Sequence, residues 1–398
     1  MKLTIIGHTV ETAKTDGFDM QEAKKFCGKG AAICYMKEPY FNSYVSADEG
    51  AENRYNRVIG TGHTSIADSV FINVLFENCS KMQAMILDVM IRFYSALEKS
   101  GRYTVIGDTP TYKKWVGVYT DLIQKANPDM DSKLVDKLAL ENARYVLNVF
   151  AKTTTMEYVT TLRNWTNIYY MCLDYMRYNS GKAESGINYY LYREIQDIAN
   201  SILEAGLVDD KIPNKFPEGI TFLADQSGYT IDDSNVTYGT VFFTPFVCSF
   251  VTLAQLIRHR TLDYYICTDD EYGFYVPEII RDTQYKQVWI DDLCELMEEE
   301  GYFPNALRYK CYMYGSITNF TRLCTDRLCA RVQKETFDVV KSIMQDITDS
   351  RNNLPDFAKL QLEPYYNFDT NEVKMKCTRI KCTEPCYWGG EKGKTRNI

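Results

Sequence analysis

The sequence predicts an α+β fold built from two related halves. The chain has 398 residues, of which 45% are hydrophobic and 25% charged, an ordinary globular mix long enough for more than one domain. Short apolar runs rich in β-branched residues predict strands, and longer stretches with apolar residues at helical spacing predict helices. The order strand, helix, loop, extended segment, helix, helix is expected twice, which favours an internal duplication.

The first half opens on the apolar run Leu3-Thr4-Ile5-Ile6, which predicts a strand. Its best helix pattern is the apolar series Met82, Met85, Ile86 and Val89, which recurs at helical spacing. In chain order we expect a strand at 3–6, a helix at 11–26, a helix-rich stretch at 52–68, a strand at 70–76, and helices at 81–97, 131–150 and 165–176.

The second half follows a break marked by Pro213, Pro217 and Gly219. Here we expect a strand at 240–244, a helix at 250–258, an extended segment at 274–278, and helices at 289–300 and 324–347. The expected domains are a first repeat at 1–210, a second repeat at 211–366, and an irregular tail rich in Lys, Cys and Gly at 367–398.

Bulk properties exclude several classes of partner. The net charge of −8 provides no general basic field for nucleic acid, so an anionic small substrate needs a local arginine cluster. No apolar run approaches the roughly 20 residues that a membrane-spanning helix needs. The start of the chain lacks a signal-peptide pattern. We therefore expect a cytoplasmic protein that binds neither nucleic acid nor membrane, with reduced thiols despite its 13 cysteines.

The chemistry-bearing residues form three groups. Arg258, His259 and Arg260 end a predicted helix, with Gln255 three residues earlier on the face of Arg258. Arginine binds phosphate through a planar bidentate fork, although a bare basic turn can also be merely solvated. Gly62-His63-Thr64-Ser65 combines a histidine with hydroxyl groups that are also good helix caps. The third group, Glu98-Lys99-Ser100-Gly101-Arg102-Tyr103-Thr104, is either a phosphate-binding loop or a surface loop.

Together these segments resemble the flavin-dependent thymidylate synthases, the ThyX family, whose hallmark reads R-H-R-x-x-S-x-N-E-x-S-x-R-Y. Gln255 and Arg258 to Arg260 match its opening, but the continuation fails at three positions of the second half. The first half supplies the missing part and lacks the opening, where Met90 and Ile91 replace Arg-His. The departures in the second half are Ile266, Thr268 and Asp270, and the matches in the first half are Arg92, Ser95, Glu98, Ser100, Arg102 and Tyr103, with Leu97 at the family's Asn.

Other segments extend the resemblance over roughly residues 55–195 and 235–345. Gly62-His63-Thr64-Ser65 is similar to the family's Gly-His-x-Ser/Thr element, and Asp68 stands where Glu is usual. Residues 141–147 resemble the segment with a phosphate-binding arginine, here Arg144. Arg327, followed by Gln333 and Glu335, is similar to the family's late R-x-x-x-x-A-Q-x-E helix, with Val332 in place of Ala.

The resemblance implies an enzyme that methylates dUMP to dTMP. Methylenetetrahydrofolate would donate the carbon, and FAD reduced by NADPH would donate hydride. Family sites form between subunits, so one composite site joining the two halves is expected, in a homodimer that mimics the family's tetramer. The implied roles are catalysis by Glu98, Ser100 and Arg102, flavin binding by His63, Ser65, Arg258, His259 and Arg260, and substrate binding by Gln255, Arg258, Ser100, Arg102, Arg144 and Arg327.

Two questions stay open from sequence alone. Cys377, Cys382 and Cys386, with Cys329 or Cys324, are spaced like ligands of a four-thiolate zinc site, but free reduced thiols in an irregular tail are the favoured interpretation. The function also has alternatives. A related enzyme making another 5-substituted pyrimidine nucleotide, or a non-catalytic protein that binds nucleotide or flavin, would carry the same degenerate motifs.

Overall fold

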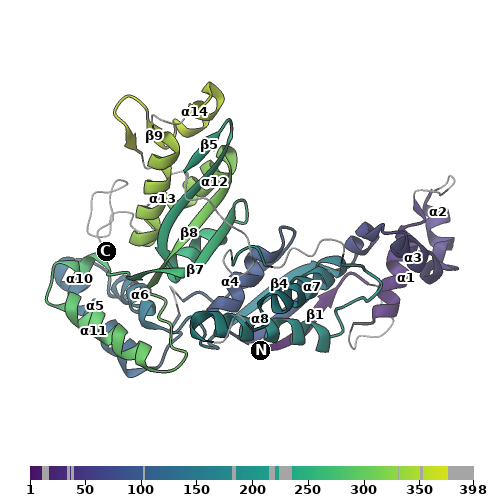
Figure 1. Cartoon of the computed structure of the whole chain (residues 1–398), viewed down its shortest axis with the longest axis horizontal. Coiled ribbons are helices and arrows are strands. Elements are labelled where there is room, and N and C mark those ends of the chain that lie inside the picture. The colour runs from purple at the N-terminus through teal and green to yellow at the C-terminus, as the bar shows by residue number, and fades with distance from the viewer. Residues whose placement is uncertain are drawn as a thin grey trace. The chain divides into compact units, whose positions relative to one another are not determined.

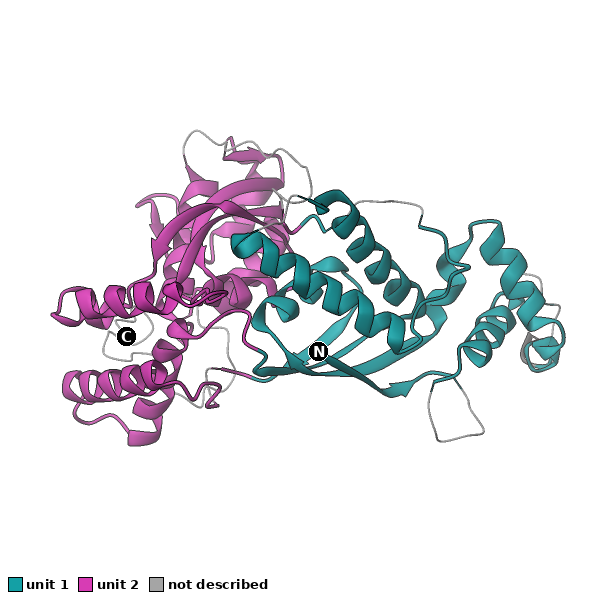
Figure 2. Ribbon diagram, turned by 60° about the horizontal axis from the view of Figure 1, so that its bottom comes forward, with its two compact units in different colours: residues 1–99, 152–221 teal, residues 100–151, 222–398 magenta. Residues whose placement is uncertain are grey.

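The chain forms an α+β structure with small antiparallel sheets packed against helices, as the sequence predicts. The structure is a computed structural model, and it describes residues 1–10, 18–33, 36, 40–101, 104–181, 185–214, 220–223, 235–329, 331–349 and 353–374. Two compact units divide the chain, and each contains two segments (Figure 2). Unit 1 comprises residues 1–99 and 152–221, and unit 2 comprises residues 100–151 and 222–398.

Unit 1 is organised around a four-stranded antiparallel sheet in the order β1-β2-β4-β3. Alternation along β2 buries Ile72, Val74 and Phe76, and Trp165 of α7 packs on this face, with its indole 6.1 Å from the Phe76 ring. The strands are β1 (Lys2–His8), β2 (Phe71–Cys79), β3 (Ser95–Glu98) and β4 (Thr154–Thr161). The helices are α1 (Met20–Gly30), α2 (Tyr40–Val45), α3 (Ala51–Gly60), α4 (Lys81–Met90), α7 (Leu162–Asn179) and α8 (Gly186–Glu204), with short 3-10 turns η2 (Ser46–Asp48) and η3 (Thr64–Ser69).

Unit 2 contains a second four-stranded antiparallel sheet, in the order β5-β6-β8-β7. Its strands are β5 (Val236–Tyr238), β6 (Val241–Ser249), β7 (Asp263–Phe274) and β8 (Leu307–Ser316), and a short hairpin pairs β9 (Tyr366–Asn367) with β10 (Glu372–Val373). Its helices are α5 (Pro110–Ala126), α6 (Ser132–Ala143), α9 (Phe250–Ile257), α10 (Glu278–Arg281), α11 (Tyr285–Glu298), α12 (Ile317–Arg327), α13 (Lys334–Thr348) and α14 (Asp356–Leu362), with η4 (Arg144–Val146) after α6.

The two sheets share one strand order and one pattern of connections. In each sheet, the second strand in the chain is followed by a helix and then by the third strand, which lies at one edge. A helical excursion, a pair of helices, then leads to the fourth strand, which pairs between the second and the third. The excursions are α5 with α6 in the first half and α10 with α11 in the second. Both lie in unit 2, where they form one core (Figure 1). Trp115 of α5 meets Trp289 of α11 edge to face, with ring centroids 4.6 Å apart.

The compact units therefore differ from the repeats expected at 1–210 and 211–366. Residues 100–151 belong to the first repeat in sequence but to unit 2 in space. Aromatic packing explains this, since Trp115, Tyr119 and Trp289 are all fully buried in the shared helical core. The repeat boundaries themselves stay a prediction, because a spatial division does not test a sequence repeat.

Four predicted helices are wrong in extent. The one expected at 11–26 begins at Met20 and ends at Gly30, and residues 11–17 lie outside the described ranges. The one expected at 81–97 ends at Met90, because Ile91 is extended and residues 95–98 pair as β3 with β4. The one expected at 131–150 ends at Ala143, where the chain tightens into η4. The single helix expected at 324–347 is two helices, α12 and α13, separated by a bend that begins at Leu328. Within the described residues, no helix combines the length and apolar character needed to span a bilayer.

Candidate functional site

The site in unit 2 centres on the side-chain amide of Gln333, just before α13. Its Oε1 accepts a hydrogen bond of 2.7 Å from Nε2 of Gln255 and another from the guanidinium of Arg144. Its Nε2 donates to the backbone oxygen of Glu141 at 3.3 Å. Gln333 has an extended backbone, with φ −54° and ψ 140°, at the position just before α13. One residue thus joins α6, η4, α9 and α13.

A second arginine reaches the same place from α12. The guanidinium of Arg327 donates to the backbone oxygen of Gln255 through Nη2 at 2.6 Å and Nε at 3.1 Å. Arg327 is the last residue of α12, so its side chain projects from the helix end toward α9. Arg144 and Arg327, which are 183 positions apart in the sequence (327 − 144), therefore both contact residues of one amide network. Two guanidinium groups held this way can share a dianionic phosphate.

The basic turn after α9 is shaped by its backbone. Arg260 adopts a left-handed conformation, with φ +56°, which residues with a Cβ rarely adopt. Its amide donates to the oxygen of Ile257 at 3.0 Å and the amide of His259 to Leu256 at 3.1 Å, so the turn closes the helix end. Backbone strain of this kind concentrates at functional sites. The strained turn agrees with a binding role for Arg258, His259 and Arg260, which stays a prediction.

His259 is neutral at physiological pH. Burial, together with the nearby positive charge of Arg327, lowers the pKa of its imidazole to about 4. Asp326 lies 3.4 Å from Nε2 and acts in the opposite direction, but its carboxylate is half exposed and does not outweigh burial. The ring can thus contribute a hydrogen bond to a ligand without contributing charge.

The loop after β3 lies beside Arg144. A Cβ at Gly101 would stand 3.9 Å from Cδ of Arg144 and 2.6 Å from Cδ1 of Ile106, whose side chain would have to shift. Thr104 closes this loop by donating to the backbone oxygen of Ser100, at 2.7 Å from its hydroxyl and 3.2 Å from its amide. Arg102 and Tyr103 lie outside the described residues. Ser100 thus starts a tight turn next to the Arg144 network.

Apart from Cys329 in unit 2, the remaining predicted residues lie in unit 1 or outside the described ranges. Glu98 is buried in unit 1, where Lys81 donates to both its oxygens at 2.9 and 3.0 Å and Thr154 donates at 3.2 Å, as in a structural ion pair. His63 and Ser65 are exposed at the start of η3 in unit 1. Cys329 is a half-buried free thiol, whereas Cys377, Cys382 and Cys386 are not described. In the described part of the chain, no group of His, Cys, Asp or Glu could hold a metal.

The central residue, Gln333, was not among the predicted binding residues. The signal was present, because Gln333 occupies the glutamine of the late motif that also contains Arg327 and Glu335. Glu335, two residues later, is buried and accepts hydrogen bonds from Ser249, Thr252 and Tyr145. Burial raises the pKa of its carboxyl, while these donors work in the opposite direction. The late motif therefore contains one residue of the site, Gln333, and one buried residue of the core, Glu335.

A comparison with protein families identifies the first half of the chain. Residues 18–213 match the model of the thymidylate synthase complementing protein family. This region is similar to that family. The match includes the histidine element at His63, the loop from Glu98 to Arg102, and Arg144, whereas Gln255 and the basic turn lie beyond it.

Solved structures with similarity to the chain are distant. The flavin-dependent thymidylate synthase ThyX from Helicobacter pylori, complexed with FAD and dUMP, is 14% identical, with 54% of this chain and all of that chain covered, at a TM-score of 0.30. A second structure of that enzyme with FAD and dUMP is 17% identical over the same shares, also at 0.30. The UMP/dUMP methylase PolB from Streptomyces cacaoi, bound with 5-Br dUMP, is 14% identical, with 52% and 90% covered, at 0.29. The comparison with curated proteins found no match.

Proposed function

We propose that this chain is a flavin-dependent enzyme that methylates dUMP to dTMP. The family match supports the reaction class. The observation that carries the proposal is the convergence of Arg144, Gln255 and Arg327 on the Gln333 network in unit 2. All three were expected to bind substrate, and they come from three elements far apart in the sequence. A chance set of solvated residues has no reason to meet in one hydrogen-bonded network.

Arg144 and Arg327 would hold the phosphate of the nucleotide. The hydrogen bonds of their guanidiniums described above go to uncharged oxygens, of Gln333 and of the Gln255 backbone. A phosphate dianion is a stronger acceptor than either, and a bidentate fork matches its geometry. Exchange of these neutral acceptors for phosphate is therefore favourable. Gln255 and Gln333 keep both arginines oriented toward the same ligand.

The residues of the basic turn fit a flavin nucleotide. Arg258 and Arg260 flank His259 at a helix end, and two cations beside a neutral ring suit a pyrophosphate with an adjoining polar group. Bound and reduced FAD would supply the hydride, with NADPH as its reductant and methylenetetrahydrofolate as the carbon donor. Arg258 and Arg260 would hold the pyrophosphate, and His259 would donate one uncharged hydrogen bond. Flavin binding by His63 and Ser65 of unit 1, which the family resemblance implies, is a separate prediction.

The site would be composite, with its loop from the first half and its glutamine and basic turn from the second. Residues 100–151 cluster with residues 222–398, which supports this reading. Ser100 and Arg102 would contact the substrate phosphate from the loop that lies beside Arg144. Glu98 would act by fixing the base of that loop through its ion pair with Lys81. Each half then keeps the residues that the other has lost.

The whole chain would be a fused pair of repeats. The equal strand order of the two sheets supports a duplication, and a homodimer of fused pairs would mimic a tetramer of single repeats. Light scattering on the purified protein checks the assembly. We expect the mass of two chains, and a stable monomer or a tetramer of full chains would contradict this part of the proposal.

Flavin absorbance followed by a tritium-release assay tests the function directly. The purified protein should carry the flavin band, and labelled dUMP should release tritium when methylenetetrahydrofolate and NADPH are added. Product analysis with dUMP and dCMP in parallel identifies the pyrimidine. A protein that carries flavin but releases tritium from neither nucleotide would overturn the proposed reaction, and one that binds no flavin would overturn the enzyme class.

A further inference from the structure

Helices α8 and α13 carry four residues of matching type at the same spacing. Glu194, Asp197, Ile198 and Ser201 on α8 recur as Glu335, Asp338, Val339 and Ser342 on α13. In both halves the serine that caps the preceding short helix donates to the glutamate. Ser80 reaches Glu194 at 2.7 Å, and Ser249 reaches Glu335 at 2.5 Å. The two helix faces are therefore equivalent places in the two sheets.

In unit 1 this face is covered by cations of the chain itself. Lys152 donates to both oxygens of Glu194 at 2.9 and 2.8 Å and lies 3.3 Å from Asp197. The α-amino group of Met1 contacts Asp197 at 3.0 and 3.2 Å. Lys152 stands two residues before β4. The corresponding position, two residues before β8, is Asn305, which cannot replace the lysine charge.

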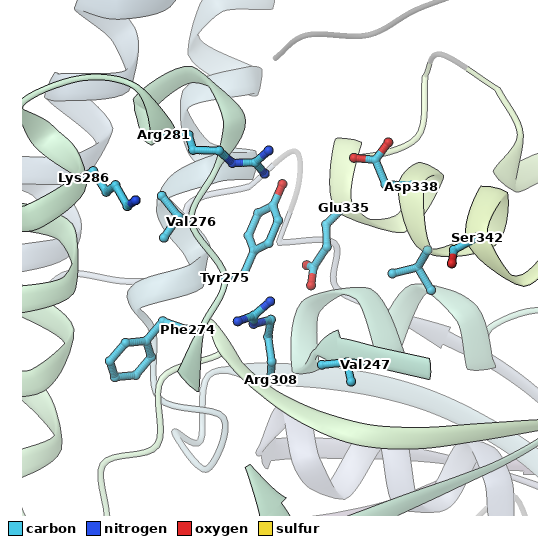
Figure 3. Close-up of a pocket in the computed structure, with 11 residues that line it drawn as sticks. Val247, Phe274, Tyr275, Val276, Arg281, Lys286, Arg308, Glu335, Asp338 and Ser342 are labelled. Carbon is cyan, nitrogen blue, oxygen red and sulfur yellow. The ribbon is translucent and has the colours of Figure 1, made fainter. Parts of the chain in front are cut away.

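In unit 2 the equivalent face lines a pocket of about 460 Å³ (Figure 3). Ligand pockets typically enclose roughly 300–1,000 Å³, so this one suits a small organic molecule. Side chains from α10, α11, α13 and three strands surround it. Figure 3 shows the guanidiniums of Arg281 and Arg308 on either side of the Tyr275 ring, with Glu335 across from them. Val247, Phe274, Val276 and Val339 supply an apolar wall.

The acidic groups that line the pocket have partners within the fold. Glu335 accepts from the backbone and hydroxyl of Ser249 and from the hydroxyls of Thr252 and Tyr145. Asp338 pairs with Lys334 on its own helix, at 2.5 Å. Neither carboxylate is therefore available as the main partner of an incoming cation.

The basic groups are less completely neutralised. Arg281 pairs with Glu278 at 2.6 Å. Arg308 donates 2.7 Å to the backbone oxygen of Tyr272, and its buried Nε has no hydrogen-bond partner among the described residues. No ion pair links Arg308 or Lys286 to a carboxylate within the part of the chain that the structure describes. The charge not matched inside the pocket is positive.

We propose that this pocket binds a small organic anion, with its carboxylate or phosphate group on Arg308 and Lys286 and its apolar body against Phe274 and Val276. The pocket does not include Arg144, Gln255 or Arg327, so the proposal does not rest on the function proposed for those residues. In the first half, Lys152 and the amino group of Met1 cover the matching helix face, so we propose no corresponding ligand there.

Calorimetric titration of the full chain with three probes tests this site. Phenyl phosphate combines an anion with an apolar body, benzylamine carries the same ring on a cation, and inorganic phosphate lacks the ring. We expect phenyl phosphate to bind more tightly than both. Benzylamine binding at least as tightly, or no binding of phenyl phosphate, would overturn the proposal.

Matched variants locate the binding. Arg308→Gln should weaken phenyl phosphate binding by about tenfold or more, because it removes a charge-assisted contact. Lys286→Gln should weaken it less. Lys341→Gln, which changes an exposed lysine of α13, should bind like the parent. A loss in Arg144→Gln with none in Arg308→Gln would assign the anion to the nucleotide site instead. If Arg308→Gln does not fold by circular dichroism, Lys286→Gln decides, and parent-like binding there would contradict the proposal.

Discussion

The side-chain amide of Gln255 donates a 2.7 Å hydrogen bond to Gln333, and the same oxygen of Gln333 also accepts from Arg144. This contact brings together residues from both halves of the chain. Gln333 directly precedes α13, and Arg327, which also contacts Gln255, ends α12. The two residues that contact Gln255 therefore stand on either side of the bend between these helices.

Removal of the central amide should loosen nucleotide binding. In Gln333→Leu, which keeps the side-chain volume, Arg144 and Gln255 lose the oxygen that orients them. We expect about tenfold weaker dUMP binding, because one oriented charge-assisted contact contributes roughly 1.5–3 kcal/mol. Gln345→Leu, an exposed glutamine of the same helix, is the control and should bind dUMP like the parent. A folded Gln333→Leu variant with parental dUMP affinity would remove Gln333 from the site.

The shared helical core should hold residues 100–151 in unit 2. Trp289→Ala removes a fully buried indole that packs on Trp115 and Tyr119 and donates 2.9 Å to the oxygen of Tyr275. We expect a loss of about 3–5 kcal/mol in the free energy of unfolding, measured by urea denaturation. The neighbouring Val288→Ala, at a 37% exposed position, should lose less than about 1 kcal/mol. Equal losses in the two variants would mean that the indole is not part of this core.

The neutral His259 should make folding stability sensitive to mild acid. Its pKa is about 4 in the folded chain and 6.5 in the unfolded chain, so between these values the unfolded state binds a proton that the folded state does not. The stabilisation is complete above pH 6.5 and is lost as the pH falls toward 4, by up to about 3 kcal/mol. His259→Asn should lack this component. Urea denaturation of both proteins from pH 7.5 to 4.5 measures it, and parallel stability curves would contradict the buried neutral ring.

The two capping serines should differ in importance. Ser249→Ala removes a helix cap and a donor to Glu335, which has no lysine partner among the described residues, so we expect a loss of about 2–3 kcal/mol. Ser80→Ala removes the same contacts to Glu194, but Lys152 stays bound there, so the expected loss is about 1 kcal/mol. Urea denaturation of the two variants gives the comparison. A larger loss in Ser80→Ala would contradict the view that Lys152 supports Glu194.

The sequence predicted those helices and strands that show a clear apolar pattern within their own residues. The strands at β2 and β6 and the helices α4, α7, α9 and α11 follow from apolar alternation or helical spacing. Strands β4 and β8 were missed, although they are central in their sheets, because their alternating Thr, Tyr and Lys residues hide the pattern. Helices α5 and α8 were missed as well. The end of α4 depends on the pairing of β3 with β4, a long-range contact that no local window contains.

The site was partly predictable for a similar reason. Arg144, Gln255 and Arg327 each stood in a recognisable motif, and the structure brings them together. The motifs did not reveal that Gln333 is the residue that joins them. Nor could they reveal that Glu98 is engaged by Lys81, because an ion pair across 17 positions depends on the course of β3. Motif spacing thus identifies the candidates, and the fold decides which of them meet.

The most direct test of the composite site is a paired titration of flavin and dUMP on two variants, Arg102→Ala from the first half and Arg258→Ala from the second. Arg102→Ala should weaken dUMP binding by roughly 10- to 150-fold, since a lost charge-assisted phosphate contact costs about 1.5–3 kcal/mol, and should leave flavin binding nearly intact. Arg258→Ala should weaken flavin binding by a similar factor. If Arg102→Ala binds dUMP like the parent protein, the two halves do not share one site and the central claim is wrong.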